Sequence, residues 1–151
     1  MGNPGKSGGG GIGRDSFGAF LFAFSHGYGI GTNNRAELGA LHDTMSTCIN
    51  RGYNQVFLES DSKCVVDAFT GKSSPVWKWK YWWTRIKNLR TRGIFVIFHI
   101  PREGNGPADA LAKTTALSQQ HMSYLSFTEL PHSFKGLYNM DALGLGSLKE
   151  I

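Results

Sequence analysis

Cysteine is scarce in this sequence, and long apolar segments are missing. Its 151 residues hold two cysteines, Cys48 and Cys64, and their spacing is not that of a C-x-x-C pair. A zinc site or a disulfide framework is therefore not expected, and a reducing intracellular compartment fits. No apolar run approaches the ~20 residues that a membrane-spanning helix needs, and no charged-then-apolar signal segment opens the chain. We expect an intracellular protein with no membrane partner, although nothing separates nucleus from cytoplasm.

Acidic residues are also few, and none precedes Asp15. There are 11 Asp and Glu residues against 16 Lys and Arg, which gives a formal net charge of +5. This balance favours an anionic partner such as nucleic acid, although many basic proteins bind nothing acidic. Apolar residues make up 40% and charged residues 18%, which is typical of a globular chain. The length fits one domain with a real core.

The first part of the chain predicts a β-hairpin followed by a helix. Residues 10–25 have the pattern of two strands around a turn at 15–18. The glycines of 27–31 are too evenly spaced for a dinucleotide-binding fingerprint, and they predict a turn before the helix. The helix is expected to run from about residue 32 to 51, because Leu38, Leu41 and Met45 recur at helical spacing.

The rest of the chain predicts alternating strands and helices. In order these are a strand at 56–58, a helix at about 62–70, a tryptophan-rich helix, a strand at 94–98 and a helix that starts near Pro107. We therefore expect a mixed α/β domain with an antiparallel hairpin at its start, parallel strands later and helices on its flanks. From about Ser123 the tail is expected to be a poorly packed extension.

Three carboxylates occupy positions from which they can reach one end of the sheet. Glu37 shares a helix face with Leu41 and Met45, so it is expected to point at the sheet rather than at water. Asp61 follows an apolar strand, and Asp109 lies in the first turn of the last helix. Ligands gather at the carboxyl ends of strands in open α/β sheets, so these acids are candidate metal ligands.

Each acid also has an ordinary structural interpretation. Glu37 and Asp109 could be first-turn acids that the helix dipole favours, and Asp61 could be the N-cap of the next helix. Carboxylates that converge, however, repel one another unless a divalent cation binds them, and oxygen ligands with room for water suit magnesium. Two such ions about 4 Å apart activate a water and stabilise the leaving oxygen in phosphodiester cleavage.

Three motifs, in their order and spacing, resemble those of ribonuclease H type 1. They are TNNRAEL (Thr32 to Leu38), ESDSK (Glu59 to Lys63) and GNGPADALAK (Gly104 to Lys113). The closer similarity is to the plant ribonuclease H-like domain of reverse-transcriptase-related, retrotransposon-derived proteins. It implies the ribonuclease H-like fold, with the domain at residues 1–120 and a C-terminal extension at 121–151.

This resemblance implies a catalytic set of four acids that hold two Mg²⁺ ions, with Mn²⁺ as a substitute. Glu37, Asp61 and Asp109 match the last three acids of that set. The first acid would fall before Met1, so residues 2–5 are expected to be the turn of a hairpin whose first strand is mostly missing. Asp15 is not expected to replace it, because its position belongs to the next turn.

The resemblance also implies contacts with nucleic acid. Asn3, Asn33 and Asn34 match positions at the backbone and minor groove of the hybrid, where a 2′-hydroxyl marks RNA. Asn33 could instead cap its helix. Arg102 is expected to be a phosphate contact or a solvated loop charge. Asn105 is expected to be a contact or the N-cap of the last helix.

His99 lies at the family's spacing before the last aspartate. The matching histidine of the family helps to shuttle protons or release product, and histidine has a suitable pKa. Plant-type members need not use it, and His99 directly follows a strand. Both a catalytic role and a purely structural one are therefore open.

The tryptophan-rich stretch has two interpretations. Residues 77–83 interleave aromatic and basic side chains, as proteins that bind single strands do. Trp79, Trp82, Trp83, Ile86 and Leu89 also recur at helical spacing, which favours a stripe that faces the core. The lysines and arginines beside them could still meet phosphates.

The function that the resemblance implies is metal-dependent endonucleolytic hydrolysis of the RNA strand of RNA–DNA hybrids. The partner would be a hybrid or another nucleic acid, and the protein would be a monomer. Because one of four carboxylates is absent, activity as an enzyme stays open. The alternatives are a nucleic-acid-binding module with impaired catalysis and a truncated gene fragment that does not fold stably.

Overall fold

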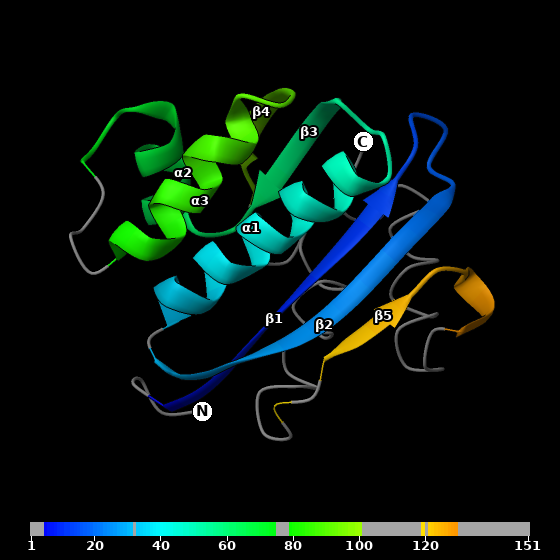
Figure 1. The fold of residues 1–151 in the computed structure, drawn as a ribbon, viewed down its shortest axis with the longest axis horizontal. Coiled ribbons are helices and arrows are strands. Elements are labelled where there is room, and N and C mark those ends of the chain that lie inside the picture. The colour runs from blue at the N-terminus through cyan, green and yellow to red at the C-terminus, as the bar shows by residue number, and fades with distance from the viewer. Residues whose placement is uncertain (1–4, 32, 75–78, 101–118, 120, 130–151) are drawn as a thin grey trace.

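The computed structural model of the chain describes residues 5–31, 33–74, 79–100, 119 and 121–129 (Figure 1). Within this part, strands lie on one side and helices α1, α2 and α3 cover them. The expected order of elements is confirmed up to β4, and the expected last helix lies outside the described residues. The elements are β1 (Gly5–Arg14), β2 (Phe20–Gly31), α1 (Asn33–Asn50), β3 (Gln55–Ser60), α2 (Lys63–Thr70), α3 (Lys80–Arg90), β4 (Ile94–His99), β5 (Met122–Tyr124) and the short 3₁₀ helix η3 (Phe127–Glu129).

The chain opens with a long antiparallel hairpin, β1–β2. Asp15 makes the expected turn, since its Oδ1 accepts hydrogen bonds from the amides of Phe17 and Ala19, both 2.9 Å long. The strands are longer than predicted, because their pairing extends to Gly5 and Gly31. Backbone hydrogen bonds of the ladder need no side chains, so the glycines of 27–31 stay in the strand instead of forming the expected turn.

The glycines of β1 let α1 lie close to the hairpin. A Cβ on Gly9 would lie 2.9 Å from the Cβ of Ala40 and 2.5 Å from the ring of Tyr28. A Cβ on Gly11 would lie 2.7 Å from the hydroxyl of Thr44. Any larger residue at these two positions would push the helix away from the sheet.

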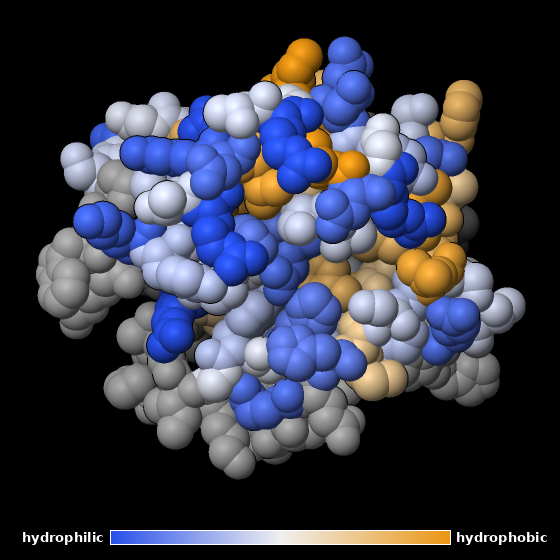
Figure 2. All heavy atoms as spheres, viewed as in Figure 1, coloured by the Kyte–Doolittle hydropathy of each residue, from blue (hydrophilic) through white to orange (hydrophobic). Residues whose placement is uncertain are grey.

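The core lies between the helices and the strands. Leu38 and Met45 of α1 and Ile86 of α3 are completely buried, and hydrophilic side chains cover much of the helical face in Figure 2. Trp79 and Trp83 are only 8% and 7% exposed. The stripe of the tryptophan-rich helix therefore faces the core, as its spacing predicted.

Strands β3 and β4 form a parallel pair, separate from the β1–β2–β5 sheet within the described residues. Helix α2 follows β3 directly. Its N-cap is Ser62, whose side chain accepts from the amide of Val65, and it ends at Gly71, which has a φ of 81°. The structure thus confirms the mixed fold, with an antiparallel hairpin, parallel strands and flanking helices.

The start of the tail departs from expectation. Residues 122–124 form β5, which pairs antiparallel with β2, and Tyr124 is buried. These three residues pair with the sheet through the backbone, whereas a poorly packed extension was expected from about residue 121. In the part of the chain that the structure describes, no helix has the length and apolarity to cross a membrane.

Candidate active site

Asp61 lies at the carboxyl end of β3, immediately after Ser60. It is half-buried. The structural alternative for this acid was a role as helix cap, but Ser62 caps α2. The alternative is therefore wrong, and the carboxylate of Asp61 stands where a parallel strand ends.

His99 lies beside this position. It is the last residue of β4, and its register partner in the parallel pair is Ser60. The amide of Ile100 donates to the carbonyl of Ser60 at 3.0 Å, which holds the two strand ends together. We call Ser60, Asp61 and His99 the carboxyl edge. The side chain of His99 is exposed there.

Glu37 lies in the second turn of α1, on a helix that begins at Asn33. No acid occupies the first turn, so the helix-dipole interpretation of Glu37 is wrong. Its side chain is half-buried. Burial and the neighbouring Asp43 raise the pKa of Tyr28, and the charge of Glu37 adds to this rise.

The other predicted site residues lie outside what the structure describes. These are Asn3, Arg102, Asn105 and Asp109. The backbone of Asn33 and Asn34 opens α1, and their side chains are outside the description. Among the described residues, no three His, Cys, Asp or Glu side chains gather into a metal-binding group. The predicted triad includes Asp109, so it stays a prediction.

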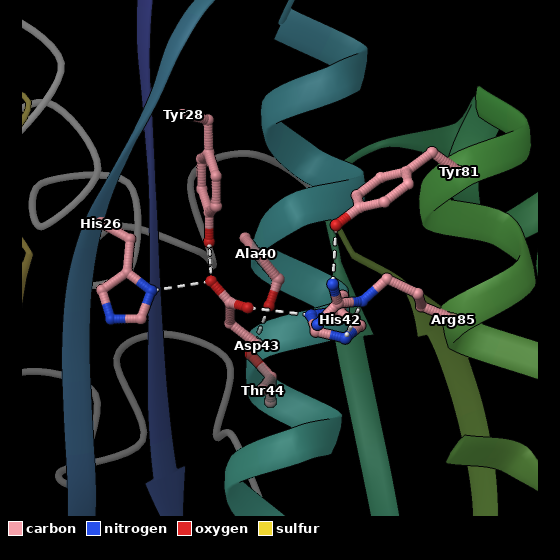
Figure 3. A network of polar contacts seen from close by, with 8 residues as sticks. All are labelled: His26, Tyr28, Ala40, His42, Asp43, Thr44, Tyr81 and Arg85. Atoms are coloured by element: carbon pink, nitrogen blue, oxygen red, sulfur yellow. Dashed lines mark hydrogen bonds and ion pairs between the residues drawn. The ribbon is translucent and has the colours of Figure 1, made fainter. Parts of the chain in front are cut away.

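A polar cluster that the sequence did not reveal surrounds Asp43 of α1 (Figure 3). The Oδ2 of Asp43 accepts from the Nδ1 of His26, at 2.7 Å, and from the hydroxyl of Tyr28. Its Oδ1 accepts from the Nδ1 of His42 at 2.9 Å. The available signal was weak: His26 and Tyr28 are two apart on one strand, so they share a face.

These partners decide the charge of Asp43. Burial raises the pKa of its carboxyl, but the hydrogen bonds from His26, His42 and Tyr28 outweigh burial and hold that pKa well below its usual range. Asp43 is therefore an ionised acceptor. Burial, and then the neighbouring charge of Asp43, raises the pKa of Tyr28, so its hydroxyl stays protonated and donates.

The cluster continues to α3 through Arg85. Its Nε donates to the Nε2 of His42 at 3.2 Å, and its Nη1 donates to the hydroxyl of Tyr81 at 2.7 Å. Guanidinium groups are donors only, so the Nε2 of His42 must be an acceptor. The Nε2 of His42 therefore carries no proton in this arrangement, and its Nδ1 is the donor to Asp43.

Comparison with known proteins agrees with this fold. The family model described as reverse transcriptase-like matches residues 2–115. Ribonuclease H1 from the halophilic archaeon Halobacterium salinarum is 30% identical, with a TM-score of 0.73 over 80% of this chain and 92% of the archaeal chain. The chain belongs to the reverse transcriptase-like family of ribonuclease H domains. This assignment confirms the resemblance that its three motifs predicted.

Two further structures are similar to this ribonuclease H-like domain. LC11 ribonuclease H1, solved in complex with an RNA/DNA hybrid, is 29% identical, with a TM-score of 0.71 over 76% of this chain and 88% of the other. The N-terminal ribonuclease H domain of a Mycobacterium tuberculosis protein is 19% identical, with a TM-score of 0.57 over 71% and 95% of the two chains, and shows the fold alone. No curated protein matches the chain.

Proposed function

We propose that this domain binds RNA–DNA hybrids and hydrolyses their RNA strand with divalent metal ions. One observation carries the proposal: Asp61 ends a parallel strand and does not cap the following helix, in a chain 30% identical to a ribonuclease H1. Carboxylates at such strand ends are where α/β folds bind ligands. The hybrid held by LC11 ribonuclease H1 supports the choice of substrate.

The donor set fits magnesium. Glu37 and Asp61 offer carboxylate oxygens, which hard divalent ions prefer, and both residues are partly exposed. Neither acid is used in the first turn or at the cap of its helix. We propose that Glu37, Asp61 and Asp109 hold two Mg²⁺ ions, which supply an activated water and stabilise the leaving oxygen when they are bound.

The described residues on either side of Asp109 support its inclusion. Ile100 lies beside the carboxyl edge. The chain is next described at Gln119, whose Oε1 accepts from the amide of Gly29 in β2. Strand β2 leads into α1, which carries Glu37. Ile100 and Gln119, the described residues on either side of Asp109, therefore contact the end of β3 and strand β2, respectively.

The remaining residues have supporting roles in this proposal. His99, exposed at the carboxyl edge, takes up or releases a proton near the scissile phosphate. Asn33 and Asn34 at the start of α1 contact the minor groove, where the 2′-hydroxyl distinguishes RNA from DNA. Asn3, Arg102 and Asn105 contact the phosphate backbone and help to position the hybrid.

The second candidate function is a nucleic-acid-binding module without turnover, and it differs from the first only in whether bound hybrid is cleaved. The only acid at or before residue 15 is Asp15, and its Oδ1 is engaged by two amides of its own turn. It lies at the far end of β1 from Gly5, as its position predicted. Asp15 is therefore a turn residue and not a candidate metal ligand.

The test is incubation of the 151-residue chain with an RNA–DNA hybrid labelled on either strand. We expect cleavage of the RNA strand with Mg²⁺, stronger cleavage with Mn²⁺, and none with EDTA or on the matching DNA duplex. Binding of the hybrid by a folded chain that cleaves neither strand would contradict the enzyme and support the binding module. Neither binding nor cleavage would contradict both.

A further inference from the structure

The Asp43 cluster joins three elements that are far apart in the sequence. His26 and Tyr28 come from β2, His42 and Asp43 from α1, and Arg85 from α3 (Figure 3). The side chains of Asp43 and His42 are only 20% and 8% exposed, so water does not satisfy them easily. Buried polar groups of this kind hold one arrangement of their elements, because any other leaves a charge unpaired.

Both hydrogen bonds that link Arg85 through His42 to Asp43 have a fixed direction. The guanidinium can only donate, so it sets the tautomer of His42, and the Nδ1 proton of His42 then points at Asp43. Reversing any one bond would place two donors or two acceptors face to face. The cluster therefore specifies the rotation of α1 about its own axis as well as its distance from α3.

Close packing around Tyr28 leads from this cluster towards Glu37. A Cβ on Gly39 would lie 2.7 Å from the Tyr28 ring, so the ring lies directly on the backbone of α1. The Tyr28 hydroxyl bonds Asp43 at its tip, and the charge of Glu37 acts on the same hydroxyl. Tyr28 thus packs on α1 from Gly39, two residues after Glu37, to Asp43.

We propose that Asp43 is a positioning residue that holds α1, and with it the Glu37 carboxylate, in one place between β2 and α3. The link from Glu37 to metal binding rests on the proposed function, whereas the placement of α1 does not. Asp43 itself does not bind metal in this proposal, because His26, Tyr28 and His42 already occupy both of its oxygens.

The first arm of the test measures the tautomer of His42 directly. Long-range ¹H–¹⁵N NMR of the wild-type chain is expected to show His42 with a proton on Nδ1 and none on Nε2. In Arg85→Met the tautomer should become mixed, because the fixed donor is gone. A wild-type His42 that carries its proton on Nε2, or on both nitrogens near neutral pH, would overturn the proposal.

The second arm compares Asp43→Asn with Asp67→Asn. Asp67 is a matched control because it lies on α2 and its carboxylate pairs with the exposed Lys63 of the same helix. Amide hydrogen exchange of residues 37–41 should become faster in Asp43→Asn relative to that of α2, and should not change in Asp67→Asn. Unchanged exchange in a folded Asp43→Asn would overturn the proposal. If Asp43→Asn does not fold, hydrogen exchange of residues 37–41 is measured in Arg85→Met instead, and unchanged exchange there would overturn the proposal.

The third arm separates this proposal from the proposed function. For cleavage of a labelled hybrid, Asp43→Asn is expected to need about tenfold more Mg²⁺ for the half-maximal rate, as outer-shell losses do. An unchanged Mg²⁺ requirement would overturn the link to Glu37. A wild-type chain that cleaves nothing would contradict the proposed function, while the tautomer and exchange results would still decide the placement of α1.

Discussion

The Asp43 cluster and the carboxyl edge place an aspartate in two different settings. Asp43 accepts three hydrogen bonds from protein side chains, and its pKa is held well below the usual range. Asp61 lies half-buried at a strand end, next to an exposed histidine on the neighbouring strand. The carboxylate of Asp43 joins helices to the sheet. The carboxylate of Asp61 belongs to a strand end, which is where α/β folds bind ligands. Position in the fold, rather than residue type, separates the two roles.

The largest effect should come from the carboxyl edge. Asp61→Asn keeps the size of the side chain but removes its charge, so we expect a loss of hybrid cleavage of about a hundredfold or more, equal to about 3 kcal/mol. The melting temperature should change little. Asp67→Asn on α2 is the control and should cleave as the wild type does. Equal cleavage by both variants would remove Asp61 from the site.

Asp43→Asn should act on stability instead. Loss of a charged acceptor with three partners is expected to cost about 2–3 kcal/mol of unfolding free energy at neutral pH. Because the folded pKa of Asp43 is lowered, its contribution is present above the unfolded pKa of about 3.9 and is lost as pH falls through the folded value.

Denaturant unfolding between pH 7 and pH 2 measures this difference. The wild type should lose stability in the acid range more steeply than Asp43→Asn does, so that the two curves converge at low pH. Parallel curves would mean that the Asp43 carboxylate is not stabilised by its neighbours in the folded state.

A change at Gly9 tests the support of α1 without touching an acid. Gly9→Ala places a Cβ 2.9 Å from Ala40 and 2.5 Å from the Tyr28 ring, and overpacking of this kind costs about 1–3 kcal/mol. Gly93→Ala, whose Cβ would meet neighbours at 3.0–3.2 Å, is the matched control with a smaller expected loss. Thermal unfolding of both variants measures the loss of stability. A Gly9→Ala variant that is as stable as the wild type would mean that α1 does not pack this closely against β1.

The smallest effect is expected at Ser62, the neighbour of Asp61. Ser62→Ala removes the cap of α2 and should cost about 1 kcal/mol of stability. Cleavage by the folded variant should stay unchanged, which is the opposite of the pattern expected for Asp61→Asn. If Ser62→Ala were as stable as the wild type but lost most of its cleavage, the assignment of Ser62 as a cap and Asp61 as a metal ligand would be wrong.

Features set by local patterns were predicted well from the sequence. The turn at Asp15, the buried face of α1 and the tryptophan stripe of α3 depend on residues a few positions apart, and the structure confirms them. The position of Asp61 after β3 followed in the same way, because an apolar run marks where a strand ends.

Features that depend on distant segments were missed. The cluster joins His26, Asp43 and Arg85, and no local pattern brings these three together. The glycines of 27–31 stay in β2 only because β1 pairs with them, and β5 forms only because β2 offers an edge. Propensity alone favours a turn at such glycines, and tertiary pairing overrides it.

An Mg²⁺ titration followed by ¹H–¹⁵N NMR tests the central claim most directly. The account predicts that amides around Glu37, Asp61 and Asp109 shift together and saturate at one Mg²⁺ concentration. Amides around Asp43 should not show a separate Mg²⁺-binding transition. Shifts at Asp43 that exceed those at Asp61, or no common response of the three acids, would contradict the account.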